Sequence, residues 1–424
     1  MSETDSRHAG LAAFQHIDFV LYQIERFSVV AALEMQSVAV GWQVYEITRR
    51  PLDLGYVGLA QFLPNMVLFL VAGHAADRFS RKNLLLMCNL GFAICSALLI
   101  AITRLGAHNV RPIYAVLVLL GIVRAFNSPA GRALLPALVP IEVFPNAVAW
   151  SSTAYQTAAI LGPAMGGLVY AVFRGPTGVY ATSVVACLIA TAALARIRVR
   201  RVARQNEEIS LRTVFAGLHY IWTHKIIFGS ISLDLFAVLL GGSLALLPVY
   251  AREILHTGPW GLGLLRAAPG VGAAFMAILL AYQPMRRQVG KTMLLCVGGF
   301  GVFTIIFGIS HSLVLSLISL MLVGATDMVS IVIRSTLVQI ATPDAVRGRV
   351  NAVDMIFIGA SNELGEFESG VTAHWFGTVP AVILGGVGTL LVVTLWAWMF
   401  PELRQADRLV PAQEDTAQLI TDLE

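Results

Sequence analysis

Long apolar runs recur along the whole chain, separated by short segments that hold most of its charged residues. Most runs reach or exceed the roughly 20 residues that a helix needs to cross a bilayer. They are continuous, without the strict alternation of a barrel strand, and therefore predict helices. Twelve membrane-spanning helices are expected, at 19–47, 54–76, 83–104, 112–134, 146–172, 177–196, 226–250, 262–283, 292–310, 313–337, 350–373 and 380–400.

Composition supports an all-α membrane protein. Of the 424 residues, 57% are hydrophobic and 13% are charged, whereas soluble domains are about one quarter charged. That difference excludes an ordinary soluble enzyme. The four cysteines lie within apolar runs at spacings unsuited to a metal site. The net charge of +4 comes from cations at helix ends, so we expect no nucleic-acid partner.

Lysine and arginine are distributed unevenly between the connecting segments. With the N-terminus inside the cell, 19 of them fall on the cytoplasmic side and 6 on the external side. Cytoplasmic loops of multi-pass proteins carry such an excess. The bias predicts a multi-pass protein of the bacterial inner membrane with both termini in the cytoplasm.

The two halves of the chain repeat. Pro64 recurs as Pro269, 205 residues later, and Gly121 recurs as Gly324, 203 residues later. A nearly constant offset of about half the length indicates a duplicated six-helix unit, the parallel repeat of one transporter architecture. We expect a tail at 1–18, a six-helix bundle at 19–196, a basic linker at 197–225, a second bundle at 226–400 and a tail at 401–424.

Charges enter the apolar runs with a period of three helices. Glu34, Arg124, Asp234 and Asp327 lie deep within the first, fourth, seventh and tenth runs, and the interiors of the third, sixth, ninth and twelfth carry no charge. A charge at the bilayer centre costs about 2.5–3.5 kcal/mol, so it must face a partner or water. The first helix of each triplet should therefore line a central cavity, and the third should face lipid.

Two of these charges are expected to face each other. Arg124 and Asp327 each follow a repeated glycine by three residues, so they would be pseudo-symmetry mates across the cavity. They would pair in one conformation and separate in another, or hold a proton or a charged substrate. The alternative is a permanent ion pair that fixes helix packing.

The remaining carboxylates are candidate proton carriers. Glu34 and Asp234 would load and release a proton in a poorly hydrated cavity, or hydrogen-bond to a neighbouring helix instead. Glu25 and Arg26, near one end of the first run, are expected to form a local or interfacial pair.

The eleventh run contains an unusual number of acids. Glu363 and Glu366 are three residues apart and share a helix face. They would bind a proton or cation or stabilise an outer gate, with Arg266 as a counter-ion. The alternative is that the span ends early and leaves these carboxylates in water.

A short charged segment joins the second and third runs. It extends from Gly73 to Lys82 and contains Asp77, Arg78 and Arg81. The string resembles the loop motif G-x-x-x-D-R-x-x-R-K of the major facilitator superfamily. The resemblance covers nearly the whole chain and implies the fold of that family, with two six-helix bundles.

The resemblance also implies a cytoplasmic gate. In the family, the loop aspartate meets the start of the eleventh helix and its nearby arginines. The corresponding residues here are Asp77, Arg347 and Arg349.

The fifth run carries a second motif. Gly162, Pro163, Gly166 and Gly167 form the string G-P-x-x-G-G, which resembles the antiporter motif of exporting facilitators. Proline bends a helix and small residues allow close approach. The alternative is ordinary close packing.

Together these features predict a proton-coupled transporter that exports a small organic molecule by alternating access. The resemblance is closest to the branch with the enterobactin exporter and other siderophore or drug exporters. No phosphate-binding loop or catalytic motif appears, so we expect no enzyme activity, metal or cofactor. The expected partners are membrane lipid, the substrate and protons, and the expected state is a monomer. A lysolipid facilitator and a non-transporting sensor are the alternatives.

Overall fold

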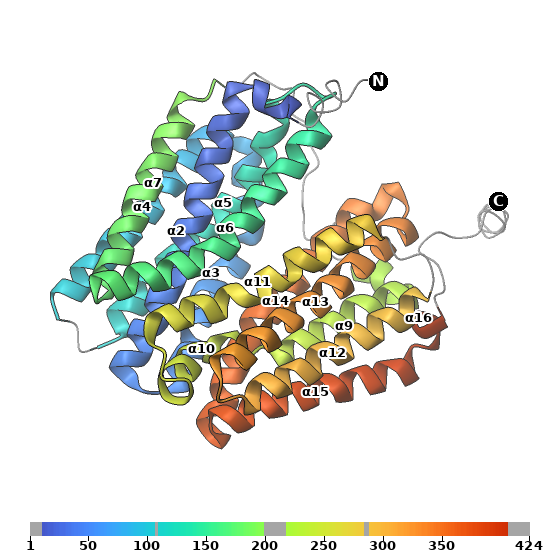
Figure 1. Ribbon diagram of the computed structural model, residues 1–424. Helices are drawn as coiled ribbons and strands as arrows, with labels where there is room; N and C mark the ends of the chain where they lie inside the picture. The colour runs from blue at the N-terminus through green and yellow to red at the C-terminus, as the bar shows by residue number, and fades with distance from the viewer. Residues whose placement is uncertain (1–10, 107–108, 199–217, 284–287, 406–424) are drawn as a thin grey trace.

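The computed structural model describes residues 11–106, 109–198, 218–283 and 288–405, and these residues are almost entirely helical (Figure 1). The first half contains α2 (Ile17–Thr48), α3 (Pro51–Arg78), α4 (Arg81–Arg104), α5 (Arg111–Leu134), α6 (Phe144–Phe173) and α7 (Pro176–Arg196). The second half contains α9 (Lys225–Gly241), α11 (Gly258–Tyr282), α12 (Val289–Ile309), α13 (Leu313–Ala341), α14 (Asp344–Phe376) and α15 (Thr378–Met399). Short elements are η1 (Ala12–Gln15), η2 (Leu135–Ala137), η3 (Leu244–Leu246), α10 (Leu247–Val249), η4 (Tyr250–Ile254) and α16 (Pro401–Gln405).

The expected twelve long helical segments are present, and the all-α fold is confirmed. Nine of the described helices are long and apolar enough to cross a membrane. Part of the basic linker, at 199–217, and the tails at 1–10 and 406–424 lie outside the described residues.

The seventh segment differs from the single helix expected at 226–250. Helix α9 ends at Gly241, and the chain continues through η3 and α10 into a π-helical turn, η4. Consecutive glycines at 241 and 242 weaken the helix at this point. Ser369 of α14 donates a hydrogen bond to the carbonyl of Gly242, which satisfies a backbone group freed by the break.

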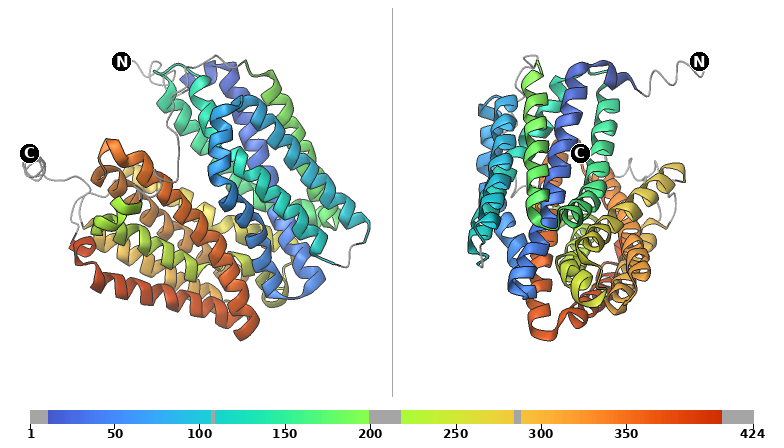
Figure 2. Two further views of the ribbon diagram at one scale, coloured as in Figure 1. Left: turned by 180° about the vertical axis from the view of Figure 1, so that it is seen from behind. Right: turned by 60° about the vertical axis from the view of Figure 1, so that its left-hand side comes forward.

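The helices form two bundles that follow the two halves of the chain. In the first, α2 packs on α6 and α7, and α3 packs on α5. In the second, α11 packs on α13, and α12 packs on both α13 and α15. The two bundles meet at one end and diverge towards the other, where η1 and α16, the first and last described elements, lie (Figures 1 and 2). We call these the closed end and the open end.

The repeat is visible in helix packing. A Cβ at Gly121 would collide with the carbonyl of Gln61 on α3, and one at Gly324 with the carbonyl of Pro269 on α11. The mates thus make the same contact, in which the fourth helix of each bundle lies against the second without a side chain between them. In a membrane the hydrophobic effect does not drive helices together, because lipid chains are themselves apolar. Close van der Waals packing at small residues stabilises their contacts instead.

Glycines also join the two bundles near the closed end. A Cβ at Gly167 of α6 would lie 2.9 Å from the Cα of Gly263 on α11. A Cβ at Gly370 of α14 would lie 3.0 Å from the Cα of Gly55 on α3. The fifth helix of each bundle therefore contacts the second helix of the other through a pair of glycines, and the two contacts are pseudo-symmetric.

The third and sixth helices of each bundle expose large apolar side chains to the surroundings. Met87 of α4, Leu295 of α12 and Trp398 of α15 are 70%, 75% and 79% exposed. These uncharged faces suit contact with lipid chains, as the period of three predicts.

Candidate functional site

A cavity of about 790 Å³ lies between the bundles. Most of its lining comes from α2 and α5, and α14 contributes Asn362 and Glu363 from the other bundle. Glu34 and Arg124, two of the four deep charges, line this cavity. The lining is rich in charged and amide side chains, so the cavity suits a polar ligand.

The deep part of the cavity holds charges from both bundles. Glu34 of α2, Arg124 of α5 and Arg266 of α11 each interact electrostatically with Glu363 and Glu366 of α14. We call these five residues the central cluster. It contains three carboxylates and two guanidinium groups, so one carboxylate has no matching cation within the cluster.

Local packing positions the central cluster. A Cβ at Gly58 of α3 would lie 2.9 Å from Oε2 of Glu366 and 3.3 Å from Oε2 of Glu363. The missing side chain therefore gives both carboxylates room beside α3. Arg266 donates a hydrogen bond to the hydroxyl of Ser37 on α2, which links α11 to the first bundle.

These positions correct one alternative from the sequence. Helix α14 continues to Phe376, well past Glu363 and Glu366. Their carboxylates lie between the bundles, and both residues are partly buried. Arg266, expected as their counter-ion, interacts with both.

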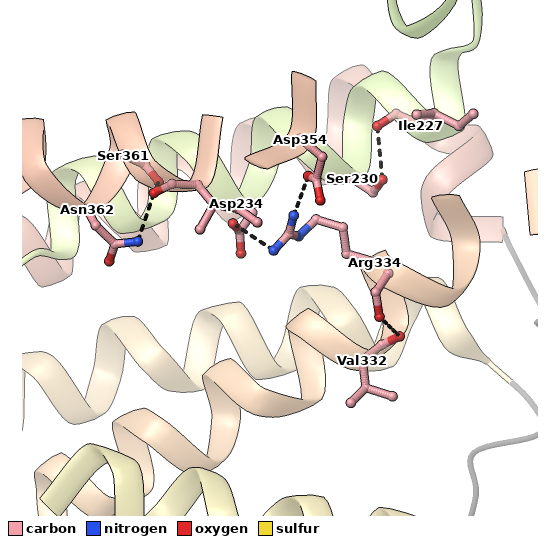
Figure 3. A network of polar contacts seen from close by, with 10 residues as sticks. Ile227, Ser230, Asp234, Val332, Arg334, Asp354, Ser361 and Asn362 are labelled. Carbon is pink, nitrogen blue, oxygen red and sulfur yellow. Dashed lines mark hydrogen bonds and ion pairs between the residues drawn. The ribbon is translucent and has the colours of Figure 1, made fainter. Parts of the chain in front are cut away.

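A second group of charges lies inside the other bundle. Arg334 of α13 is within 3.4 Å of Asp234 on α9 and also forms an ion pair with Asp354 on α14 (Figure 3). Its side chain is 3% exposed. Asp327, two turns earlier on α13, interacts electrostatically with Asp234 and Arg334. Asp234, a candidate proton carrier, is therefore ion-paired within its own bundle.

Arg124 and Asp327 are not ion-paired in this conformation, so the alternative of a permanent ion pair between them is wrong. Arg124 interacts with the carboxylates of the central cluster, and Asp327 with Asp234 and Arg334. The two mates have equivalent places in their helices, but they have different neighbours. Asp327 and Arg334 are seven residues apart and share a helix face, which places Asp327 towards the charges of its own bundle.

Arg334 is a charged residue that the sequence reasoning missed. It lies within the expected tenth helix, near its predicted end, and has no charged counterpart at the repeat offset, 203 residues earlier, where Gly131 stands. Its spacing of seven from Asp327 could have revealed it, because that spacing indicates a shared face.

The loop cations stabilise helix ends within the first bundle. Arg81 donates to the carbonyl of Ala133 at 2.6 Å, near the end of α5. Lys82 donates to the carbonyls of Ala195 and Ile197 at 2.8 and 2.7 Å, at the end of α7. Cations are favoured at these positions because helix carboxyl ends carry partial negative charge.

The expected contact of Asp77 with the arginines at the start of α14 is not tested by the structure. The side chain of Asp77 lies outside the described residues. Arg347 donates to the carbonyl of Thr342 at 3.2 Å, and Arg78 and Arg349 are exposed. Gly73 has open space where a Cβ would stand.

The glycine–proline motif of α6 lies at the junction of three helices. A Cβ at Gly162 would lie 2.6 Å from the Cβ of Glu34, and one at Gly166 would lie 2.8 Å from the Cα of Met35, both on α2. Gly167 and the carbonyl of Pro163 contact α11 of the other bundle. The motif therefore packs α6 against both bundles beside the central cluster.

The closed end carries two reciprocal ion pairs between the bundles. Nη1 of Arg49 lies 2.9 Å from Oε1 of Glu253, and Nη1 of Arg252 lies 3.4 Å from Oε1 of Glu46. The Arg252 guanidinium also lies 5.4 Å from the ring centre of Trp42. These contacts join the end of α2 to η4 and hold the closed end together.

Glu25 and Arg26 interact electrostatically, but their side chains form no direct ion pair. Oε1 of Glu25 accepts a hydrogen bond of 3.0 Å from Asn89 on α4, and Glu25 is 4% exposed. Arg26 instead donates to the hydroxyl of Tyr22 at 3.2 Å. Consecutive residues of a helix point about 100° apart, so the two side chains contact different neighbours.

Comparison with known proteins gives consistent matches over nearly the whole chain. Residues 9–422 match the family model described as transmembrane secretion effector. The enterobactin exporter EntS of Citrobacter koseri is 26% identical over 416 residues, covering 95% of this chain and 96% of that protein. EntS of Escherichia coli O81 is 26% identical over 408 residues, covering 93% and 95%.

Solved structures resemble this one in fold. A bacterial homologue of the human lysosomal transporter Spinster, in an inward-facing and unoccupied conformation, superposes with a TM-score of 0.71 at 13% identity, covering 94% of this chain and 99% of that chain. A D-xylose–proton symporter superposes with a TM-score of 0.68 at 15% identity, covering 91% and 98%. At these identities the likeness shows a shared fold.

Proposed function

The chain belongs to the transmembrane secretion effector family of the major facilitator superfamily, and we propose that it exports a small organic molecule in exchange for protons. It is a multi-pass membrane transporter, and transporters of this kind are not enzymes and need no cofactor. The proposal concerns the coupling ion, the direction and the substrate.

The central cluster carries the proposal of proton coupling. Its three carboxylates and two guanidinium groups come from four helices, two in each bundle. One bound proton would make the cluster electrically neutral. An unbalanced buried charge is costly, so the cluster favours binding that proton while the bundles hold it together.

Alternating access would make this proton binding depend on conformation. Opening the closed end would move α2 and α5 away from α11 and α14, because the bundles rock as units around a central site. Glu34 and Arg124 would then part from Glu363, Glu366 and Arg266, and the proton affinity of each carboxylate would change.

Export is proposed from orientation and relatives. The excess of cations at the open end and in the segments adjoining it favours a cytoplasmic location for that end, with both termini in the cytoplasm. The cavity would then open to the cytoplasm, where an export substrate binds. The curated relatives are named enterobactin exporters, which favours a siderophore-like or drug-like molecule and the bacterial inner membrane. We propose a monomer surrounded by lipid.

The amphiphile facilitator is less well supported. Its cavity would need an extended apolar wall for acyl chains, whereas charged, amide and hydroxyl side chains supply much of this lining.

Proton coupling can be tested in proteoliposomes that carry an imposed pH gradient. The assay would follow both dye movement and internal pH, with carboxyfluorescein and rhodamine dyes as probes. The test variants are Glu34→Gln, Glu363→Gln and Glu366→Gln. Asp327→Asn tests the charges of the second bundle. Glu402→Gln is the control because that residue lies beyond α15, where its carboxylate pairs with Lys225 and contributes to neither group of charges.

We expect gradient-driven export in the wild type and in Glu402→Gln. A central-cluster variant should retain downhill dye movement but lose its dependence on the gradient, because a glutamine cannot release a proton. Loss of coupling in Asp327→Asn alone would assign proton binding to the second bundle. Dye movement independent of pH in every protein would refute proton coupling.

A further inference from the structure

We propose that the cavity selects an organic anion that carries an aromatic ring, and that Arg26 and Arg132 bind its charged group. The inference rests on the proposed transport function and names its substrate class. Both arginines line the cavity towards the open end, away from the central cluster. We call Arg26, Arg132, Tyr22 and Tyr155 the entrance site.

Arg26 is held in place by neutral groups. Its Nη1 donates to the hydroxyl of Tyr22 at 3.2 Å, and that hydroxyl donates to the carbonyl of Gly131 at 3.0 Å. Its guanidinium carbon lies 5.4 Å from the ring centre of Tyr155 on α6. The Nε is buried and has no hydrogen-bond partner among the described residues. The side chain is thus oriented, with a donor left unused.

Arg132 also has a neutral partner, and this partner is a weak acceptor. Its Nη1 lies 2.7 Å from Sδ of Met355, on α14 of the other bundle, and a thioether is a weak acceptor. The two guanidinium groups repel each other, since each interacts with the other's charge. Within the described part of the chain, no carboxylate lies within 4.0 Å of either group.

The acidic residues of the cavity lining have partners other than these two arginines. Glu25 interacts electrostatically with Arg26, but its carboxylate accepts a hydrogen bond from Asn89 on α4 and forms no ion pair with that arginine. Glu34 and Glu363, the other acids of the lining, belong to the central cluster with its own two arginines. Two neighbouring cations therefore share a cavity without an ion pair. Such an arrangement is costly when desolvated, and an anionic ligand would offset the cost.

The chemistry of the entrance site defines its ligand. A guanidinium group binds carboxylate, sulfonate or phosphate through two parallel hydrogen bonds. Tyr22 is buried and orients Arg26, whereas Tyr155 is 43% exposed and adds a hydroxyl group and an aromatic ring beside these donors, which suits an aryl group near the charge. A cationic ligand would meet two like charges before it reached the central cluster.

The test uses two xanthene dyes of opposite charge, 5-carboxyfluorescein and rhodamine 123. Binding to the purified full chain in detergent would be measured by fluorescence anisotropy without any ion gradient, at low and high salt. The variants are Arg26→Gln and Arg132→Gln, which keep polar volume, and Arg26→Lys, which keeps charge. Arg104→Gln removes a cation from an exposed position at the far end of α4 and is the matched control. Thermal unfolding of each variant checks its folding.

We expect the wild type to prefer carboxyfluorescein, more strongly at low salt. Each glutamine variant should weaken carboxyfluorescein binding about tenfold or more, since it removes hydrogen bonds to a charged group. Arg26→Lys should recover part of the loss, and Arg104→Gln should bind like the wild type. Preference for rhodamine 123, or unchanged carboxyfluorescein binding in both glutamine variants, would overturn the proposal.

A lipid head group offers the same anionic chemistry as a soluble substrate. The binding is therefore repeated in nanodiscs of phosphatidylcholine with and without phosphatidylglycerol. Displacement of the dye by phosphatidylglycerol in the wild type would assign the anion to lipid and refute a soluble one. Because binding is measured without a gradient, failure of proton coupling in proteoliposomes leaves this result standing, and the reverse also holds.

Discussion

The glycine contacts between the bundles predict a conformational effect of a single methyl group. A Cβ at Gly167 would lie 2.5 Å from the carbonyl of Pro259 and 2.9 Å from the Cα of Gly263. Both neighbours are backbone atoms of α11, so they yield only if the helices move apart. Gly167→Ala should therefore destabilise the closed end.

The size of the effect follows from two opposing contributions. Overpacking in a well-packed contact costs about 1–3 kcal/mol. Alanine also gains about 1 kcal/mol of helix propensity over glycine. That gain stabilises folding but is the same in both conformations, so it leaves their equilibrium unchanged. The equilibrium constant for keeping the closed end shut should fall by about 5–150-fold, since 1.4 kcal/mol corresponds to a factor of ten.

The control is Gly359→Ala in α14, where a Cβ would meet nothing within 4 Å. Gly359→Ala should gain the same helix propensity and leave the equilibrium between the closed and the opened arrangement of the bundles unchanged. The pseudo-symmetric Gly370→Ala, whose Cβ would lie 3.0 Å from the Cα of Gly55, should behave like Gly167→Ala.

Electron–electron distance measurements between spin labels would report the equilibrium. Labels on cysteines placed at Arg111 and Phe376, both exposed and one in each bundle, should show longer distances in Gly167→Ala. A distance distribution identical to that of Gly359→Ala would refute the reasoning, because it would mean that α11 accommodates the methyl group without separating the bundles.

Three further substitutions test other contacts. Arg334→Met leaves the buried Asp234 and the partly buried Asp354 without their cation, and a loss of about 3–5 kcal/mol of stability should appear as a lower midpoint of thermal unfolding. Gly58→Ala would press against the carboxylate of Glu366, so it should alter the pH dependence of transport more than the unfolding midpoint. Arg252→Gln removes an ion pair and a contact with an aromatic ring, each worth roughly 0.5–1 kcal/mol, and should lengthen the same label distances modestly.

Much of the fold could be predicted because its causes are local. The length and apolarity of each run require a helix in a bilayer, whatever its neighbours are. The break after Gly241 could not be placed in the same way. The glycines permit it, but the hydrogen bond from Ser369 to Gly242, 127 residues away in sequence, satisfies the opened backbone.

The candidate site was predictable only in part. The sequence singled out Glu34 and Arg124 as deep charges and Arg266 as a counter-ion of Glu363 and Glu366. It did not indicate that these two groups lie together. The repeat places Arg124 and Asp327 at equivalent positions in the fourth helix of each bundle. This equivalence predicted that the two residues face each other across the cavity.

The sequence by itself determined the number of helices, the twofold repeat, the membrane environment and the charges that enter it, because these depend on the length, period and composition of single segments. The tertiary structure alone decided which charges are partners. A helix presents each side chain at an angle fixed by its own 3.6-residue turn, but the neighbour at that angle depends on how the helices cross. Glycines such as Gly121 and Gly167 set those crossings by removing side chains from the contacts. Partner choice is therefore a property of the assembled bundles.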